Sequence, residues 1–491
     1  MRPMKKLLLS LLLLVNLSAL NAASIDLMST LNSVETRIKN STGDYSHLMA
    51  SLTSIKSELF NVNPLDLDLE LEKTKALETV TKLHTIKLML QSSLNGLPID
   101  YAGRDDIAED VKTVISSIRY LEDYLYEQIY NTLPTKPKDK MLLPFTNLTA
   151  FSTKGHDFDG SIESLKTGDI IIVRTLLFLG AMISRIGDAP LTYSHMALVY
   201  ADPVTNKKYV VESTLNTGFK KTELTPAFFE NMVRVAVYRP KNSELGRMAG
   251  NFGNEKFEEG IRIGKPLQYD LSMGLKENCK YYCSKFVSWA YNSIQQKEVI
   301  PEFPSRLLHK NGGYLEGLSI PKASKYTFAP TDIDLDSTFH LIYEYRNPKL
   351  TPAARLNDLI VDKMFFWLRT ENLEFVPGPL HDQFARFVVG LAGRPYINRI
   401  MSMLGMHLNT EIKPKNLALL AASMLYVTKM RKAIAPAYKE HYEKYGVPMS
   451  PKEIYKLIDK VRKENPSYVK QFRKRTPINM CLRFYTLSKA Q

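Results

Sequence analysis

The hydrophobic period of this 491-residue chain changes twice along its length, and these changes limit the folds that it can adopt. From residue 24 to about 133, apolar residues recur at helical spacing, and short β-rich runs replace them from about 134 to 350. Helical spacing returns after Pro348. The first apolar positions at helical spacing are Leu27, Leu31, Val34 and Ile38. With 44% hydrophobic and 24% charged residues, the chain is neither disordered nor fibrous, and its length suits about three folded parts.

Residues 1–23 have the three parts of a secretory signal peptide. Basic residues come first, residues 7–14 form an apolar run broken only by Ser10, and small residues follow at Ala22 and Ala23. The apolar run is shorter than the ~20 residues that cross a bilayer. We therefore expect a cleaved signal and an exported protein, periplasmic or extracellular, with an uncleaved anchor as the alternative.

Positive charge is concentrated in the last third of the chain. Residues 351–491 hold 24 Lys and Arg against 11 Asp and Glu, which is +13 of the net +14 of the whole chain. Such a region attracts anionic surfaces, so an anionic membrane or a cell-wall polymer is an expected partner. The alternative is a solvated helical surface. No nucleic-acid-binding motif accompanies the charge, and nucleic acid is not an expected partner.

The arrangement of the expected elements favours an α+β fold, since helices and strands are partly segregated. The expected strands are residues 169–173, 195–200, 209–213, 233–238 and 339–345, and the expected central helices are 251–260 and 282–294. Breaks at 61–64 and 95–98 predict three helices in the first block, and the last block should hold helices near 352–370, 380–406, 414–432 and 450–463. The predicted domains are a helical bundle (24–133), a central α+β domain (134–350) and a basic helical domain (351–491). For the helical bundle, a spacer or docking module is the expected role.

Cys283 is the first candidate for chemistry. It precedes an apolar stripe at helical spacing that begins with Phe286 and Val287, so it should open a helix. Unpaired N–H groups and the helix dipole favour a negative charge at such a position, which lowers the pKa of a thiol. The alternative is a buried, inert cysteine. With three cysteines in the chain, a disulfide framework is excluded.

His195 and Glu212 are candidates for the partners of that thiol. His195 opens an expected strand and shares a face with Ala197 and Val199, where we expect the helix of Cys283 to pack. Glu212 follows two apolar β-branched residues at the end of the next strand, a position where a carboxylate is unusual without a partner. If the two strands pair, Glu212 can orient the imidazole of His195. Taken singly, each residue also has an ordinary structural explanation.

Residues from about 161 to 346 resemble the permuted papain-like amidases of the YiiX/YaeF type, relatives of the NlpC cell-wall peptidases. The segments that carry the resemblance are 165–173 (LKTGDIIIV), 184–186 (SRI), 193–199 (YSHMALV), 209–213 (YVVES) and 282–287 (YCSKFV). The resemblance implies a permuted papain-like domain in which the histidine strand precedes the cysteine helix. It also implies that Cys283, His195 and Glu212 are the catalytic residues.

Two tyrosines are candidates for contact with the substrate. Tyr269 stands in GKPLQYD (264–270), which resembles a Gly-Lys-Pro-Tyr-Asp element of the family with two residues inserted. Tyr282 precedes the candidate nucleophile and could position a carbonyl oxygen, although packing is the simpler role. The stretch 176–186 should form an amphipathic helix that lines the groove and could receive an acyl chain, or else be buried in the core.

These observations predict an exported cysteine amidase or peptidase. Its substrate would be a peptide or acyl amide, with a cell-wall peptide as one candidate, and no metal or cofactor is expected, because no Cys and His cluster has metal-ligand spacing. One alternative keeps the three residues but makes the protein an acyltransferase or lipid hydrolase. Another is a non-catalytic binding or scaffold protein.

Overall fold

The computed structural model describes residues 26–129, 149–152, 158–378, 383 and 413–474, apart from short gaps at 42, 68, 160, 216–217, 277–278, 298 and 310–312. The expected signal peptide, the expected helix at 380–406 and Cys481 lie outside the described residues. Within the described part of the chain, no helix has both the length and the apolar character that crossing a bilayer requires.

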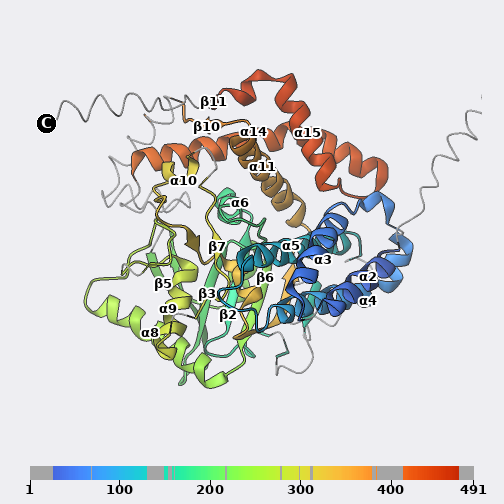
Figure 1. The fold of residues 1–491 in the computed structure, drawn as a ribbon. Helices are drawn as coiled ribbons and strands as arrows, with labels where there is room; N and C mark the ends of the chain where they lie inside the picture. Colours follow the sequence, from blue (N-terminus) through green and yellow to red (C-terminus); the bar gives the residue numbers. More distant parts are fainter. Residues whose placement is uncertain are drawn as a thin grey trace, which may run out of the picture.

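An antiparallel sheet of seven strands forms the centre of the molecule, in the order β1-β9-β6-β2-β3-β4-β5 (Figure 1). Its strands are β1 (Thr149–Ser152), β2 (Ile170–Thr175), β3 (His195–Ala201), β4 (Lys208–Thr214), β5 (Gly218–Glu223), β6 (Met232–Pro240) and β9 (Phe339–Arg346). Five of them were predicted from the sequence. β1 and β5 were not, and for β5 the reason is that its sequence GFKKTE is largely polar. A polar strand rich in lysine is typical of a sheet edge, which is where β5 lies.

One face of the sheet is covered over β3 and β4 by two helices. They are α8 (Ser243–Arg262) and α9 (Cys283–Gln295). Side chains of α9 share a core with Ile172, Met196 and Leu198. Ala197 and Val199 belong to a second core on the opposite face. The expectation that α9 packs on the face of Ala197 is therefore wrong, because strand side chains alternate and α9 selects the other set. The mixed arrangement is an α+β fold, as predicted.

The N-terminal part consists of four α-helices within residues 26–129, where the breaks in the sequence predicted three. They are α2 (Leu27–Asn40), α3 (Tyr45–Phe60), α4 (Leu69–Ser93) and α5 (Arg104–Ile129). The additional break follows Ser41, where Gly43 has a positive φ of 84°. Asp44 then caps α3 by accepting a hydrogen bond from the N–H of His47 at 3.0 Å.

The C-terminal part packs around α11 (Thr351–Thr370), α14 (Pro414–Tyr445) and α15 (Pro451–Glu464). α14 is longer than predicted because it continues through Pro436, and it ends at Gly446, where φ is 70°. Two three-residue strands, β10 (Leu373–Phe375) and β11 (Phe472–Lys474), pair beside these helices. The core of this part includes Ala181 and Met182 from the central region.

Short elements complete the description. They are η1 (Pro64–Asp66), α6 (Phe178–Ile183), α7 (Pro226–Phe229), β7 (Ser305–Arg306), α10 (Tyr314–Gly317), β8 (Tyr326–Thr327), η3 (Pro330–Leu335) and η4 (Pro466–Val469). α6 is the helix expected to line the groove. Its residues Ala181 and Met182 lie instead in the core with α11, so the simpler explanation, burial, applies.

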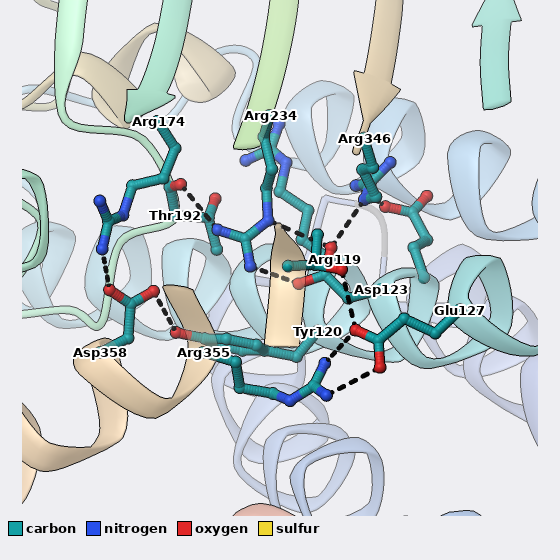
Figure 2. A network of polar contacts seen from close by, with 12 residues as sticks. Arg119, Tyr120, Asp123, Glu127, Arg174, Thr192, Arg234, Arg346, Arg355 and Asp358 are labelled. Atoms are coloured by element: carbon teal, nitrogen blue, oxygen red, sulfur yellow. Dashed lines mark hydrogen bonds and ion pairs between the residues drawn. The ribbon is translucent and has the colours of Figure 1, made fainter. Parts of the chain in front are cut away.

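Buried ion pairs join α4 and α5 to the sheet and to α11, and we call them the charge network (Figure 2). Its basic side chains are Lys87, Arg119, Arg174, Arg185, Arg234, Arg346 and Arg355, and its acidic side chains are Glu122, Asp123, Glu127, Asp334, Glu344, Asp358 and Asp362. Asp123 on α5 lies between Arg234 of β6 and Arg346 of β9, with each Nε 3.1 Å from its Oδ1. The N-terminal helices are thus joined to the sheet and to α11 by buried ion pairs.

Candidate active site

Cys283 is the first residue of α9, as the sequence predicts. The helix forms because Phe286, Val287 and Ala290 bury one apolar stripe against the sheet. Tyr282 is the N-cap residue, with extended backbone and no side-chain hydrogen bond to the first turn. The N–H groups of that turn are thus not capped by the side chain of Tyr282, and the positive end of the helix dipole acts on the sulfur.

The start of α9 is held from two sides. On one side, Ser213 at the end of β4 donates its hydroxyl to the carbonyl oxygen of Tyr281 at 2.6 Å. On the other, the hydroxyl oxygen of Tyr282 accepts hydrogen bonds from the N–H of Phe328 at 2.9 Å and the hydroxyl of Thr327 at 3.2 Å. Tyr282 is 2% exposed. Its hydroxyl is therefore held by hydrogen bonds within the core. This place fits the simpler of the two roles considered for Tyr282, which is packing.

His195 and Glu212 lie where β3 and β4 separate. The ladder between these strands runs from Ala201↔Lys208 to Leu198↔Val211 and goes no further toward His195. Past the end of this ladder, the side chains of His195 and Glu212 bridge the two strands, with Nε2 of His195 2.5 Å from Oε2 of Glu212. The pairing of the two strands and the contact between the two residues are as the sequence predicts.

The sulfur of Cys283 reaches the same place. It lies close enough to the His195 side chain and the backbone N–H of Met196 for both to stabilise the thiolate, and it is 3.7 Å from the hydroxyl oxygen of Ser284. Since Nε2 of His195 faces Glu212, Nδ1 is the ring nitrogen left to face the sulfur. Contact between Cys283 and His195 thus arises at the end of the sheet, from the first residue of α9, although the rest of the helix packs on the other face.

The charges of the site support one another. Burial opposes a charged His195, but the neighbouring Cys283 and Glu212 raise the pKa of its imidazole to about 10. Burial likewise opposes a thiolate, yet His195 and the hydrogen bonds to the sulfur lower the pKa of Cys283 below its usual value. The raised pKa of His195 and the lowered pKa of Cys283 both favour a thiolate–imidazolium pair at neutral pH. Cys283 is 4% exposed, whereas the His195 side chain is 22% exposed, so the imidazole is the more accessible group of the pair.

Glu212 is buried, with a side chain 3% exposed. Burial would raise the pKa of its carboxyl, but His195 and Lys220 together lower it, so that the carboxylate is the favoured form. Lys220 is a neighbour that the sequence analysis missed. A lysine in a polar run carries no signal of a role, and β5 itself was not predicted.

Tyr269 is also close to Cys283. It is 4% exposed, and after burial the charge of Cys283 is the largest cause that raises the pKa of its hydroxyl. The loop that carries Tyr269 is fixed to α9 by a buried ion pair, in which Nζ of Lys285 lies 2.9 Å from Oδ2 of Asp270. The same Nζ donates to the carbonyl oxygen of Lys276 at 2.7 Å. This pair was also missed, since neither residue lies in a motif that implies it.

No group of three or more His, Cys, Asp and Glu side chains in the described part of the chain is arranged to hold a metal ion.

Residues 164–312 match the model of the permuted papain-like amidase family, YaeF/YiiX, C92. The resemblance predicted from the sequence is confirmed. This C92 region contains His195, Glu212 and Cys283. The family supports a cysteine-type amidase or peptidase, and its model extends neither to the N-terminal helices nor to the C-terminal part.

The crystal structure of the metalloprotein yiiX from Escherichia coli O157:H7 is similar to part of this chain. It is 19% identical, the match covers 36% of this chain and 96% of that chain, and the TM-score is 0.29. No curated protein matches the chain.

Proposed function

We propose that the protein is a cysteine amidase or peptidase in which Cys283 is the nucleophile, His195 the general acid and base, and Glu212 the residue that orients His195. One observation carries the proposal. The sulfur of Cys283 lies beside the imidazole of His195, which stabilises the thiolate, and Nε2 of His195 is 2.5 Å from Oε2 of Glu212. This is the order of nucleophile, base and orienting carboxylate that covalent acyl transfer requires.

In the first half of the reaction, the thiolate of Cys283 attacks the carbonyl carbon of the amide, and a C–S bond forms as the carbonyl π electrons move to oxygen. His195 already holds the thiol proton in the ion pair and delivers it to the amide nitrogen. The C–N bond then breaks, and the amine leaves with an acyl-enzyme behind.

In the second half, neutral His195 takes a proton from water, whose oxygen attacks the thioester carbonyl. The C–S bond breaks, the carboxylic acid leaves, and the proton returns the site to its ion pair. Through both halves the developing oxyanion needs donors, and the N–H groups of the first turn of α9 are suited to that task. Glu212 keeps the imidazole oriented and stabilises its positive form.

We also propose that the protein acts outside the cytoplasm on a peptide or acyl amide, with a cell-wall peptide as the first candidate. The proposal of export depends on the signal-like residues 1–23, and that of an anionic membrane or cell-wall polymer as partner depends on the charge of residues 351–491. Cell fractionation of the full chain with and without residues 1–23 tests export.

The test of activity compares products. Purified wild-type protein and Cys283→Ala are incubated with native peptidoglycan and with lipid extracts, and the products are identified by mass spectrometry. New amines and carboxylic acids should appear with the wild type only. Cys279→Ala is the matched control, because Cys279 is exposed and lies four residues before Cys283, and it should retain activity. Full activity in Cys283→Ala would overturn the proposal.

The alternative of a lipid hydrolase or acyltransferase is weakened by the place of α6. The apolar stretch that suggested an acyl site is packed in the core with α11. The non-catalytic alternative leaves unexplained why a buried thiol is held against a charged imidazole. The same product comparison distinguishes them, since a lipid hydrolase would release fatty acids and a scaffold would release nothing.

A further inference from the structure

Lys220 lies directly opposite Glu212 on the edge strand. The register of β4 and β5 pairs Glu212 with Lys220, and the Nζ of Lys220 is 3.0 Å from Oε1 of Glu212. The other carboxylate oxygen, Oε2, is the one that contacts His195. Each oxygen of Glu212 therefore faces a different basic side chain.

The burial of the two partners is unequal. The Glu212 side chain is 3% exposed, whereas the Lys220 side chain is 41% exposed. Oε1 is buried, and the ammonium of Lys220 is the neutralising neighbour beside it. A buried carboxylate oxygen without compensation is costly, while an exposed ammonium keeps most of its hydration. The pair thus stabilises the ionised Glu212 without the expense of burying a second charge.

The four charges form an alternating row. It runs from the thiolate of Cys283 through His195 and Glu212 to Lys220. These groups come from α9, β3, β4 and β5, and His195 and Lys220 are the charged groups that act on Glu212. α8 also packs on β4 and β5, but its Glu258 is paired with Lys221, the next residue after Lys220, at 2.9 Å.

We propose that Lys220 is a positioning residue, which fixes the carboxylate of Glu212 and through it the orientation of His195. This inference rests on the proposed function. Lys220 has no proton-transfer role in it. Without the ammonium, the carboxylate can turn toward solvent or take up a proton, and in either case His195 loses the partner that orients it.

The test compares Lys220→Met and Lys220→Arg, with Lys221→Met as the matched control. Lys220→Met should lower kcat by roughly fivefold at neutral pH, the scale of an ion pair with one exposed partner, with KM unchanged. It should also move the acid limb of the pH–kcat profile to higher pH, because Glu212 then protonates more readily. Lys220→Arg should restore both, and Lys221→Met should change neither.

A double-mutant cycle shows whether Lys220 acts through Glu212. In the Glu212→Gln background, Lys220→Met should have no further effect on kcat. An undiminished effect there, or a change confined to KM, would overturn the inference and place Lys220 in contact with substrate. The measure that separates this inference from the proposed function is alkylation of Cys283 by iodoacetamide. If the wild-type thiol reacts at neutral pH and His195→Ala suppresses that reaction, the proposed function stands whatever Lys220→Met does.

Discussion

Two groups of buried charges in this protein differ in how completely they are paired. In the charge network, Asp123 accepts from both Arg234 and Arg346 (Figure 2). Glu344 accepts from Arg119 and Lys87. Apart from Asp362, its side chains are 5% exposed or less. In the candidate active site, a single imidazole separates the sulfur from the carboxylate, and it is 22% exposed.

The comparison teaches that shifted pKa values do not by themselves identify a reactive site. The pKa of Glu344 in the charge network lies well below its usual value, because the cations around it outweigh burial. Yet its side chain is only 1% exposed, and its neighbours are the cations that neutralise it. Cys283 and His195 combine shifted pKa values with a nucleophile and an accessible imidazole. Reactivity therefore requires a group that is incompletely paired and accessible, in addition to neighbouring charges that shift its pKa.

The largest effect should come from breaking the charge network. Asp123→Ala leaves Arg234 and Arg346 buried with one carboxylate fewer, and removal of one partner from a buried pair costs about 3–5 kcal/mol of unfolding free energy. Urea unfolding measures the loss. A stability equal to that of the wild type would show that this network does not hold α5 to the sheet.

The second effect concerns activity. Glu212→Gln keeps the shape of the side chain but removes its charge, so kcat should fall about 100-fold while the unfolding free energy changes much less than in Asp123→Ala. Kinetics on the substrate found in the product comparison, together with urea unfolding, provide the test. If Glu212→Gln instead destabilised the protein as strongly as Asp123→Ala while kcat held, Glu212 would belong with the structural charges.

The third effect is the pH dependence of the thiol. A lowered pKa keeps Cys283 ionised through neutral pH, so alkylation by iodoacetamide should persist there and decline only on acidification. In His195→Ala, the largest influence that opposes the effect of burial is lost, so the pKa of the thiol rises and the rate at pH 7 should fall about tenfold or more. Mass spectrometry of the Cys283 peptide from about pH 5 to about pH 9 follows each rate. Superimposable profiles for the two proteins would contradict the ion pair.

The smallest effect should come from an exposed pair. Arg247 and Glu244 lie three residues apart on α8, and both side chains are more than half exposed. Because water solvates both charges, Arg247→Ala should leave the urea midpoint unchanged. This variant is the baseline for Asp123→Ala. A large shift would mean that exposure does not predict which ion pairs stabilise this protein.

Much of the candidate site was predictable because its signals are local. The helix of Cys283 follows from the spacing of Phe286, Val287 and Ala290, and the strands of His195 and Glu212 follow from their apolar, β-branched neighbours. The face on which α9 packs was predicted wrongly. Alternation assigns residues to two faces, but it does not say which face a distant helix will cover.

Lys220 and the charge network were beyond sequence reasoning for a related reason. A lone lysine or arginine in a polar segment is usually a solvated surface residue. Arg119 and Glu344 are 225 positions apart, and each is buried only because the other is there. Nothing in the residues beside them indicates that partnership.

The sequence by itself determined most of the order of helices and strands, the place of the thiol at a helix start and the likeness to the C92 family, since these depend on neighbours along the chain. The tertiary structure decided which charges meet, how the sulfur reaches the imidazole and where α5 is anchored. Burial makes the difference, because removing a charge from water creates a need for a partner that only a packed fold can bring within reach.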